Sequence, residues 1–396
     1  MARVLYAWEL GGGMGHIARA GPIINGLRDR GHEVFVALRD LARATSLLDH
    51  IDDIHLLQSP LWQQQLQGAP ESASFAELLF RMGFGSPEGL EGLTRSWRAM
   101  FALVAPSLLI VDHAPTALLA ARGMAFKRAS IGNGFFSPPR QTPLPSFRTW
   151  EAVPQDRLTS ADAQALATAN TVLTRIGAPP MRALHELFDV DENFLCTLPE
   201  LEHYPGRTGQ RYWGQDMERE RGINPTWPAG DGPRVFVYVN AASGARDSII
   251  ATLQTLDLRA LLYMPGLGRA GRQQYQSSKL HFADQPVRIA AAMTDADALI
   301  GTAGVGTVAA ALLAGVPVLA MAMNAEQYIT ALNVHRAGVG LAAHQQVGAA
   351  QLTHLVSRLL NEPSFRANAH AFAQRHANVV PEQLTTQILN RCDELL

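Results

Sequence analysis

Residues 298–325 decide the fold class, and they read ALIGTAGVGTVAAALLAGVPVLAMAMNA. No residue in this stretch is charged, so a hydropathy window would flag it as a membrane span. Five residues that break regular structure interrupt it: Gly301, Gly304, Gly306, Gly315 and Pro317. The stretch therefore predicts a strand, a glycine turn, a helix, a second turn and a second strand, with the near-continuous apolar runs of a buried parallel sheet. We expect an α/β protein.

The same rhythm occurs near the N-terminus and again after the middle of the chain. Residues 3–8 predict a strand, a glycine loop and a helix follow, and residues 33–38 predict the next strand. A fresh strand begins at residues 234–240, after a stretch rich in charge, glycine and proline. The 396 residues are about twice what one domain holds. We predict a first domain at 1–215, a linker at 216–232, a second domain at 233–380, and a C-terminal helix at 381–396 whose docking site the sequence does not fix.

Composition excludes several classes of protein. Apolar residues make up 47% of the chain, charged residues 17%, and the net charge is -2. These values exclude a disordered chain and give no electrostatic footprint for nucleic acid. The two cysteines cannot build a disulfide framework or a cysteine-rich metal site, and the first residues form a strand pattern rather than a signal peptide. We expect a cytoplasmic protein. The aromatic residues of 75–101 predict core packing, with a pocket lining or a membrane-docking face as alternatives.

The glycine-rich loop after the first strand ends in His16. Gly13 and Gly15 would let the backbone approach a ligand, at the edge where open α/β sheets bind ligands. Histidine titrates near physiological pH, so His16 is a candidate general base; a capping histidine is the alternative. The loop also fits the dinucleotide fingerprint G-x-G-x-x-G/A, with Asp40 as the ribose-binding acid, which keeps a nicotinamide-dependent enzyme open.

A second glycine loop lies within the opening stretch, before the expected helix. The amides of Gly304, Val305, Gly306 and Thr307 would point at an anion, because a helix N-terminus offers unpaired N–H groups and a favourable dipole. Such a site can hold a diphosphate without a metal ion; a turn that serves only packing is the alternative. Residues 326–327, Glu326 and Gln327, place a carboxylate and an amide after a strand, a pair suited to sugar hydroxyls unless both are plain surface residues.

These segments resemble a known family. Residues 297–307, continued by 314–317 and 326–327, are similar in order and spacing to the donor-binding signature of the UDP-glycosyltransferase superfamily. That superfamily includes UDP-glucosyl- and glucuronosyltransferases and the peptidoglycan N-acetylglucosaminyltransferase. The first half resembles its acceptor domain at four places: residues 15–16, 31–34, 106–112 and 211–214. The resemblance implies the GT-B architecture, two Rossmann-like domains with parallel sheets, of which the first binds the acceptor and the second the nucleotide sugar.

The resemblance also implies a mechanism, which is usually inverting in such enzymes. His16 would deprotonate the acceptor hydroxyl, and Asp112 would accept the other imidazole N–H and stabilise the imidazolium. The amides of residues 304–307 and the side chain of Ser243 would stabilise the leaving diphosphate, with no metal ion and no cofactor beyond the nucleotide sugar.

This chain departs from the family pattern at two places. Thr302 and Ala303 stand where a histidine and a glycine are common, so a diphosphate contact is weakened unless Arg246 or Arg288 replaces it. Val287 and Arg288 occupy the region of a tryptophan-containing base-stacking motif, which leaves UDP and dTDP as equal candidates.

The expected activity is therefore the transfer of a hexose from a UDP or dTDP sugar to an acceptor hydroxyl. The alternatives are a nucleotide-sugar-binding protein without catalysis, a nucleotide-sugar epimerase and an NAD-dependent oxidoreductase. We expect a small molecule or a lipid as acceptor, no nucleic acid and no transmembrane segment, with peripheral membrane contact left open.

Overall fold

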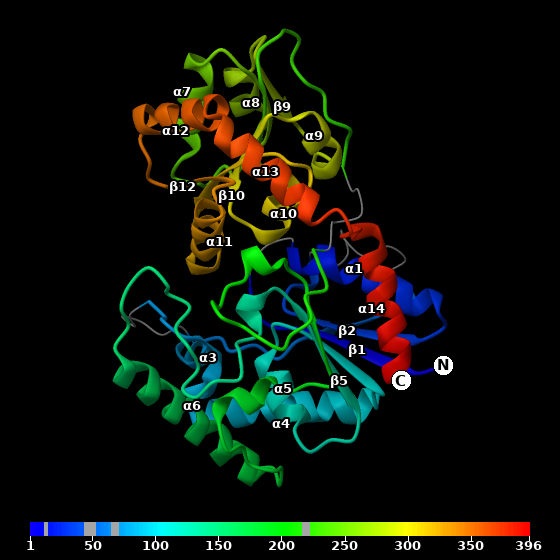
Figure 1. Ribbon diagram of the computed structural model, residues 1–396. Coiled ribbons are helices and arrows are strands. Elements are labelled where there is room, and N and C mark those ends of the chain that lie inside the picture. The colour runs from blue at the N-terminus through cyan, green and yellow to red at the C-terminus, as the bar shows by residue number, and fades with distance from the viewer. Residues whose placement is uncertain (12–14, 43–52, 65–70, 216–221) are drawn as a thin grey trace. The chain divides into compact units, whose positions relative to one another are not determined.

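The computed structural model describes residues 1–11, 15–42, 53–64, 71–215 and 222–396 (Figure 1). The chain forms two compact units, which we describe separately. Unit 1 comprises residues 1–196, 203–214 and 383–396, and unit 2 comprises residues 197–202 and 215–382. The chain thus crosses between the units several times, because short segments on either side of residue 202 and the C-terminal residues belong to the unit that they pack against.

Unit 1 is built on a parallel sheet with the strand order β3-β2-β1-β4-β5-β6. Its strands are β1 (Arg3–Trp8), β2 (Glu33–Leu38), β3 (His55–Gln58), β4 (Leu108–Asp112), β5 (Lys127–Gly132) and β6 (Glu192–Leu195). Its helices are α1 (Gly15–Asp29), α3 (Phe75–Leu79), the π-helix η2 (Phe80–Phe84), α4 (Pro87–Val104), α5 (Pro115–Ala121), α6 (Gln155–Arg175) and α14 (Pro381–Leu395), with short 3-10 helices η3 (Gly134–Phe136) and η4 (Leu184–Phe188).

Both faces of this sheet are covered, as the apolar strands predict. Alternate residues of β1 point to opposite faces: Leu5 and Ala7 join the core under α3, α4, α5 and α6, whereas Val4 and Tyr6 join the core under α1 and α14. The aromatic segment 75–101 forms much of the first core, where Trp97 and Phe101 are buried. Core packing is thus what the structure assigns to those two side chains.

The C-terminal helix α14 docks on unit 1, a placement that the sequence left open. Its apolar residues recur at helical spacing, and Leu384, Ile388 and Cys392 are buried in the same core as Ile24 of α1. Leu389 lies where the Cβ of any residue larger than glycine at position 26 would be, so α14 approaches the α1 backbone closely. Arg391 donates to Glu192 at 2.6 Å and ties the helix to β6.

Unit 2 repeats the topology, with the order β12-β11-β10-β7-β8-β9 in a parallel sheet. Its strands are β7 (Arg234–Tyr238), β8 (Arg259–Tyr263), β9 (Leu280–Ala283), β10 (Ala298–Thr302), β11 (Val318–Ala322) and β12 (Gly340–His344). Its helices are η5 (Pro199–Leu201), α7 (Arg246–Thr255), α8 (Arg269–Tyr275), α9 (Ile289–Asp295), α10 (Val305–Leu313), α11 (Ala325–Arg336), α12 (Ala349–Asn361) and α13 (Pro363–Arg375). The strand, turn, helix, turn and strand predicted for residues 298–325 are confirmed as β10, α10 and β11.

The strand order in each unit reverses between its first and fourth strands. In unit 1 this point lies between β1 and β4, and in unit 2 between β7 and β10. Loops that leave adjacent parallel strands in opposite directions open a crevice at the carboxyl edge, where ligands of such sheets bind. The candidate residues of each unit are therefore sought at these two points.

Candidate active site

His16 and Asp112 meet at the reversal point of unit 1. Asp112 is the last residue of β4 and lies opposite Trp8, the last residue of β1, in the parallel register. His16 is the second residue of α1, directly after the loop that leaves β1. Its Nδ1 lies 2.8 Å from Oδ1 of Asp112, so the two predicted residues share a hydrogen bond across 96 positions of sequence.

Asp112 is fully buried and holds its charge through its neighbours. Tyr6 donates its hydroxyl to Oδ2 at 3.0 Å, and Nη1 of Arg19 lies 3.9 Å from Oδ1. Burial alone would raise the pKa of Asp112, but its contacts with His16, Arg19 and Tyr6 hold that pKa below its ordinary value. Asp112 is therefore an ionised acceptor for the Nδ1–H of His16, and the second ring nitrogen is left for chemistry.

The position of the His16 ring depends on Gly11. The backbone of Gly11 has a φ of 94°, and a Cβ there would overlap Nε2 of His16. The ring stacks on Trp8 at a centroid distance of 5.2 Å and contacts Phe136 in a tilted arrangement at 5.3 Å. Gly15 begins α1, whereas the predicted Gly13 lies outside the described residues.

His113 is a second buried imidazole that the sequence argument missed. It follows Asp112 with a φ of 50°, and its carbonyl accepts from the N–H of Leu10 at 3.0 Å, which joins the loops after β1 and β4. Its ring stacks on Phe136 at 4.1 Å. Burial, helped by the neighbouring His16 and Arg39, lowers the pKa of His113 well below its usual value, so this ring is neutral near pH 7.

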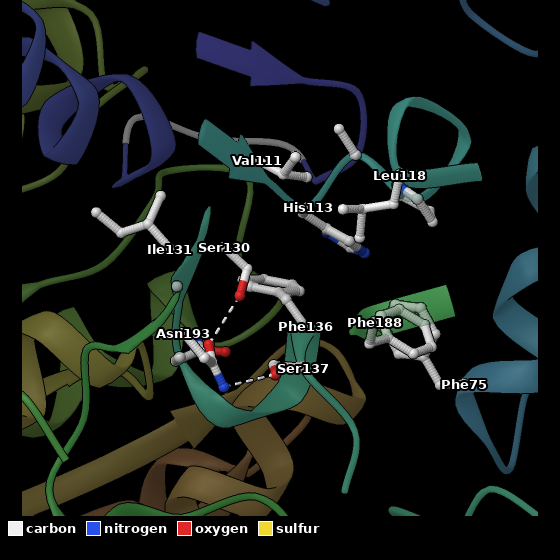
Figure 2. A pocket seen from close by; sticks show the side chains of 14 residues that line it. Phe75, Val111, His113, Leu118, Ser130, Ile131, Phe136, Ser137, Phe188 and Asn193 are labelled. Atoms are coloured by element: carbon white, nitrogen blue, oxygen red, sulfur yellow. Dashed lines mark hydrogen bonds between the residues drawn. The ribbon is translucent and has the colours of Figure 1, made fainter. Parts of the chain in front are cut away.

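Neither ring nitrogen of His113 has a hydrogen-bond partner within the described part of the chain. The ring faces a small pocket that also contains Phe75, Phe136 and Phe188, with room for about 20 Å³ (Figure 2). Across that pocket, Ser130 donates to Asn193 at 2.9 Å, and Asn193 donates to Ser137 at 3.0 Å. The space corresponds to about one water-sized group.

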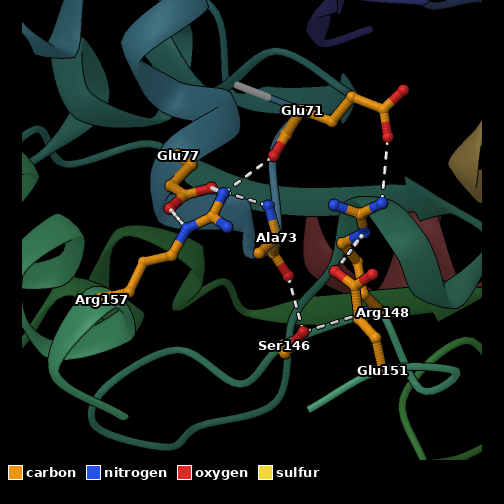
Figure 3. Close-up of polar contacts among 7 residues, drawn as sticks. All are labelled: Glu71, Ala73, Glu77, Ser146, Arg148, Glu151 and Arg157. Atoms are coloured by element: carbon orange, nitrogen blue, oxygen red, sulfur yellow. Dashed lines mark hydrogen bonds and ion pairs between the residues drawn. The ribbon is translucent and has the colours of Figure 1, made fainter. Parts of the chain in front are cut away.

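A polar network holds the segment that carries Phe75 (Figure 3). Arg157 of α6 donates to both carboxylate oxygens of Glu77, at 2.7 and 2.8 Å, and Glu77 also accepts from the N–H of Ala73 at 2.7 Å. Ser146 donates to the carbonyl of Ala73 at 2.9 Å. The start of α3 is thus fixed against α6 and the preceding loop, which positions Phe75 beside His113 at a centroid distance of 5.7 Å.

A larger cavity of about 440 Å³ is lined by residues that follow β1 and β2, among them Leu10 and Arg39. Apolar side chains form part of its wall, among them Trp62 and Met82, and two guanidinium groups, Arg39 and Arg81, also line it. The volume falls within the range of small-molecule sites, about 300–1,000 Å³. The position at the carboxyl ends of β1 and β2 matches the ligand edge of the sheet.

Glu9 contributes to the wall of this larger cavity and is 3% exposed. Its carboxylate accepts from Thr116 Oγ1 at 2.6 Å and from the N–H groups of Thr116 and Ala117 at 3.1 and 2.9 Å. Burial raises the pKa of Glu9 to about 7 in spite of these bonds. The residue links the end of β1 to the start of α5, and no motif in the sequence identifies it.

The predicted donor residues of unit 2 gather at the ends of three adjacent strands. Thr302 ends β10, and Gly304 caps α10, whose first residues are Val305, Gly306 and Thr307. No side chain caps this N-terminus, so its amides remain directed outward from the helix. Ser243 follows β7, is 6% exposed, and accepts from the N–H of Ala245 at 3.3 Å.

Glu326 and Gln327 occupy the first turn of α11, after β11. The side-chain oxygen of Gln327 accepts from the backbone N–H of Met323 at 2.9 Å, and the backbone N–H of Gln327 donates to the side chain of Asn324 at 3.0 Å. This reciprocal capping fixes the turn and leaves the Gln327 side-chain N–H₂ as a donor. The structure therefore adds a local role for Gln327 beside the predicted sugar contact.

Val287 and Arg288 lie further along the sheet, after β9. Val287 is buried and pairs with Ile223, and Nη1 of Arg288 donates to Asn224 at 3.0 Å. Arg246 is paired with Asp247 at 2.8 Å. Both arginines proposed to compensate for Thr302 thus have a polar partner in this structure.

Comparisons with known proteins agree with this architecture. A glycosyltransferase of kitacinnamycin covers 100% of this chain and 99% of its own, with a TM-score of 0.70 and 15% identity. The spinosyn rhamnosyltransferase SpnG covers 99% and 100%, with a TM-score of 0.69 and 17% identity. VinC, solved in complex with dTDP, covers 98% and 100%, with a TM-score of 0.68 and 15% identity. This chain has the GT-B fold.

The match to a sequence family is confined to unit 2 and α14. Residues 282–395 match the family described as erythromycin biosynthesis protein CIII-like, C-terminal domain. The predicted resemblance to the UDP-glycosyltransferase superfamily is thereby confirmed, as is the GT-B architecture predicted from it. No curated protein matches the sequence.

The described residues of this GT-B protein lack two features, a helix that could cross a membrane and a cluster that could hold a metal ion. None of their helices is long and apolar enough to cross a membrane. They also contain no group of three or more His, Cys, Asp and Glu side chains that could hold a metal ion.

Proposed function

We propose that this chain is an inverting glycosyltransferase that moves a hexose from a UDP or dTDP sugar to an acceptor hydroxyl. The observation that carries the proposal is the hydrogen bond between His16 Nδ1 and buried Asp112. A histidine held in one tautomer by an ionised carboxylate, at a ligand-binding sheet edge, is suited to accept a proton at Nε2.

In the proposed reaction, the acceptor O–H bond breaks as its proton moves to Nε2 of His16. The acceptor oxygen forms a bond to the anomeric carbon of the sugar, and the bond from that carbon to the diphosphate oxygen breaks. The electron pair leaves with the nucleoside diphosphate, and attack from the opposite face inverts the configuration. Asp112 stabilises the imidazolium that forms, and Tyr6 and Arg19 keep Asp112 ionised throughout.

The leaving diphosphate gains charge, which unit 2 is proposed to stabilise. The N-terminus of α10, from Val305 to Thr307, offers N–H donors and a positive dipole end, whereas the N–H of Gly304 already donates to the carbonyl of Thr302 at 2.6 Å. Ser243 and the hydroxyl of Thr302 would add hydrogen bonds. Thr302 carries no charge, so the helix dipole has a larger share of this stabilisation than it would beside a histidine.

The structural neighbours inform the choice of substrates. VinC was solved with dTDP, and SpnG was also solved with spinosyn aglycone. These complexes support dTDP as the nucleotide to test before UDP, and a small molecule rather than a lipid as acceptor. We assign the larger cavity of unit 1 to the acceptor, because its volume suits a small molecule.

The test is a transfer assay with dTDP-glucose or UDP-glucose and a naphthol acceptor, read by mass spectrometry and by the anomeric proton coupling of the product. We expect a β-linked glucoside from the α-linked donor, and no product from His16→Gln. Donor binding without product would support the binding-protein alternative, and a changed sugar without acceptor would support the epimerase. If NAD raises the melting temperature of the protein and neither nucleoside diphosphate does, the result would support the NAD-dependent oxidoreductase instead.

A further inference from the structure

The larger cavity of unit 1 combines apolar walls with two positive charges. Leu10, Leu61, Trp62, Met82 and Leu93 supply apolar surface, whereas Arg39 and Arg81 supply guanidinium groups. The carboxylate in the wall belongs to Glu9, which is buried and already accepts three hydrogen bonds from Thr116 and Ala117. Arg39 therefore supplies positive charge to the wall of the cavity.

Trp62 forms a firm flat surface in this wall. Its ring lies against the backbone of Gly83 and Gly89, and a Cβ at Gly89 would overlap the indole ring. Gly83 belongs to η2 and Gly89 to α4, so two helical segments support the ring from behind. A planar, apolar ligand body would find a surface of matching shape there.

Arg39 supplies a positively charged guanidinium group to the wall of the cavity. It follows β2, and one of its terminal nitrogens, Nη1, donates to the carbonyl of Gly11 at 3.1 Å. Within the described residues, that carbonyl is the partner of Nη1, and the guanidinium keeps Nε and Nη2 as further donors. Since a guanidinium binds a carboxylate through two parallel N–H groups, Arg39 can bind an anion while it holds the loop that precedes His16.

We propose that the larger cavity takes an aromatic acid, with its ring system against Trp62 and its carboxylate on the guanidinium of Arg39. This inference rests on the proposed function only in calling the ligand an acceptor; the preference for an anion rests on the cavity itself. It defines the acceptor class as a hydroxylated aromatic carboxylate.

The test measures binding of two isosteric probes, 6-hydroxy-2-naphthoate and 6-hydroxy-2-naphthamide, by isothermal titration calorimetry. A charge-assisted hydrogen bond contributes about 1.5–3 kcal/mol, so the acid should bind about 10- to 100-fold more tightly than the amide. Arg39→Gln should reduce this ratio to near one, because the acid loses more affinity than the amide.

The matched control is Arg95→Gln, which removes an exposed guanidinium of α4 that pairs with Glu91 at 2.8 Å. It should keep the preference of the wild type. Equal affinity for the two probes, no binding of either at millimolar concentration, or an unchanged ratio in Arg39→Gln would each overturn the proposal. An unchanged melting temperature shows that Arg39→Gln has folded.

Failure of this inference can be told apart from failure of the proposed function. The binding ratio needs neither donor nor turnover, so a preference for the acid without any product would leave the site standing and overturn the transferase. If product forms equally well on the acid and the amide, and the two probes bind with equal affinity, the transferase would stand and the preference for an aromatic acid would be overturned. His16→Gln should lose transfer and keep the binding ratio.

Discussion

Glu9→Gln should change how the stability of the protein depends on pH. Glu9 is buried at the end of β1, and its carboxylate accepts from the side chain and backbone of Thr116 and from the backbone of Ala117. Burial disfavours the charged form and raises the pKa of Glu9 from 4.5 to about 7. Glutamine keeps the shape and one acceptor oxygen but cannot ionise.

The sign follows from proton binding in the two states. Below pH 4.5 Glu9 is protonated both in the folded and in the unfolded chain, so its ionisation costs nothing. As the pH rises above 4.5, the unfolded chain releases the proton while the folded chain keeps it, so stability falls until the pH has passed about 7. At about 1.4 kcal/mol per pH unit, this group removes about 3 kcal/mol of unfolding free energy between these limits.

Urea unfolding of wild type and variant at pH values from 4.5 to 8 measures this difference. The wild-type curve should lose about 3 kcal/mol more than the Glu9→Gln curve over that range. A constant offset is also expected, because the glutamine amide leaves the N–H of Thr116 without its acceptor; only the slopes are compared. Glu88→Gln, at an exposed glutamate of α4, is the matched control. Parallel curves for wild type and Glu9→Gln would refute the reasoning.

Three other substitutions test the site. Asp112→Asn should lower kcat about 10²- to 10⁴-fold with a smaller change in donor KM, since it removes the charge that stabilises protonated His16; steady-state kinetics with an unchanged kcat would contradict this. His113→Phe should raise the unfolding free energy by about 1 kcal/mol or more, because it removes two unpartnered buried nitrogens and keeps the ring; urea unfolding would show a loss instead if these nitrogens stabilise the fold. Gly304→Trp has open space for its Cβ, so it should fold and abolish stabilisation of the protein by dTDP and UDP in a melting assay, whereas Gly348→Trp, at the N-cap of α12, should not.

The sequence predicted the elements whose pattern is local. Residues 298–325 carry their own strand, turn and helix signals, and they fold as β10, α10 and β11. His16 could be named from the glycine loop after the first strand, whereas the role of Asp112 was implied only by the resemblance to the glycosyltransferase superfamily. The register of β1 against β4 was not in the pattern, yet it is what places Asp112 beside the loop of His16.

Other features depend on packing between distant segments, which no local pattern encodes. Glu9 has its three hydrogen bonds because α5 begins beside it. His113 is buried because Phe136 and Phe75 cover its ring. The helical spacing of 381–396 indicated an amphipathic helix, but its partner was decided by Gly26, which lets α14 approach α1. Such residues require the tertiary structure before they can be identified.

Three buried groups near the reversal point of unit 1 differ in their ionisation, and this difference distinguishes their roles in the site. Burial drives the pKa of His113 down and that of Glu9 up, so both environments favour the neutral form of the side chain. Asp112 is equally buried, but Tyr6 and His16 hydrogen-bond its carboxylate and keep it ionised. Of these three buried groups, Asp112 alone has partners that maintain a full charge near pH 7. The charged carboxylate lies 2.8 Å from Nδ1 of His16. The proposed base is therefore identified less by the histidine itself than by the carboxylate that the fold keeps ionised behind it.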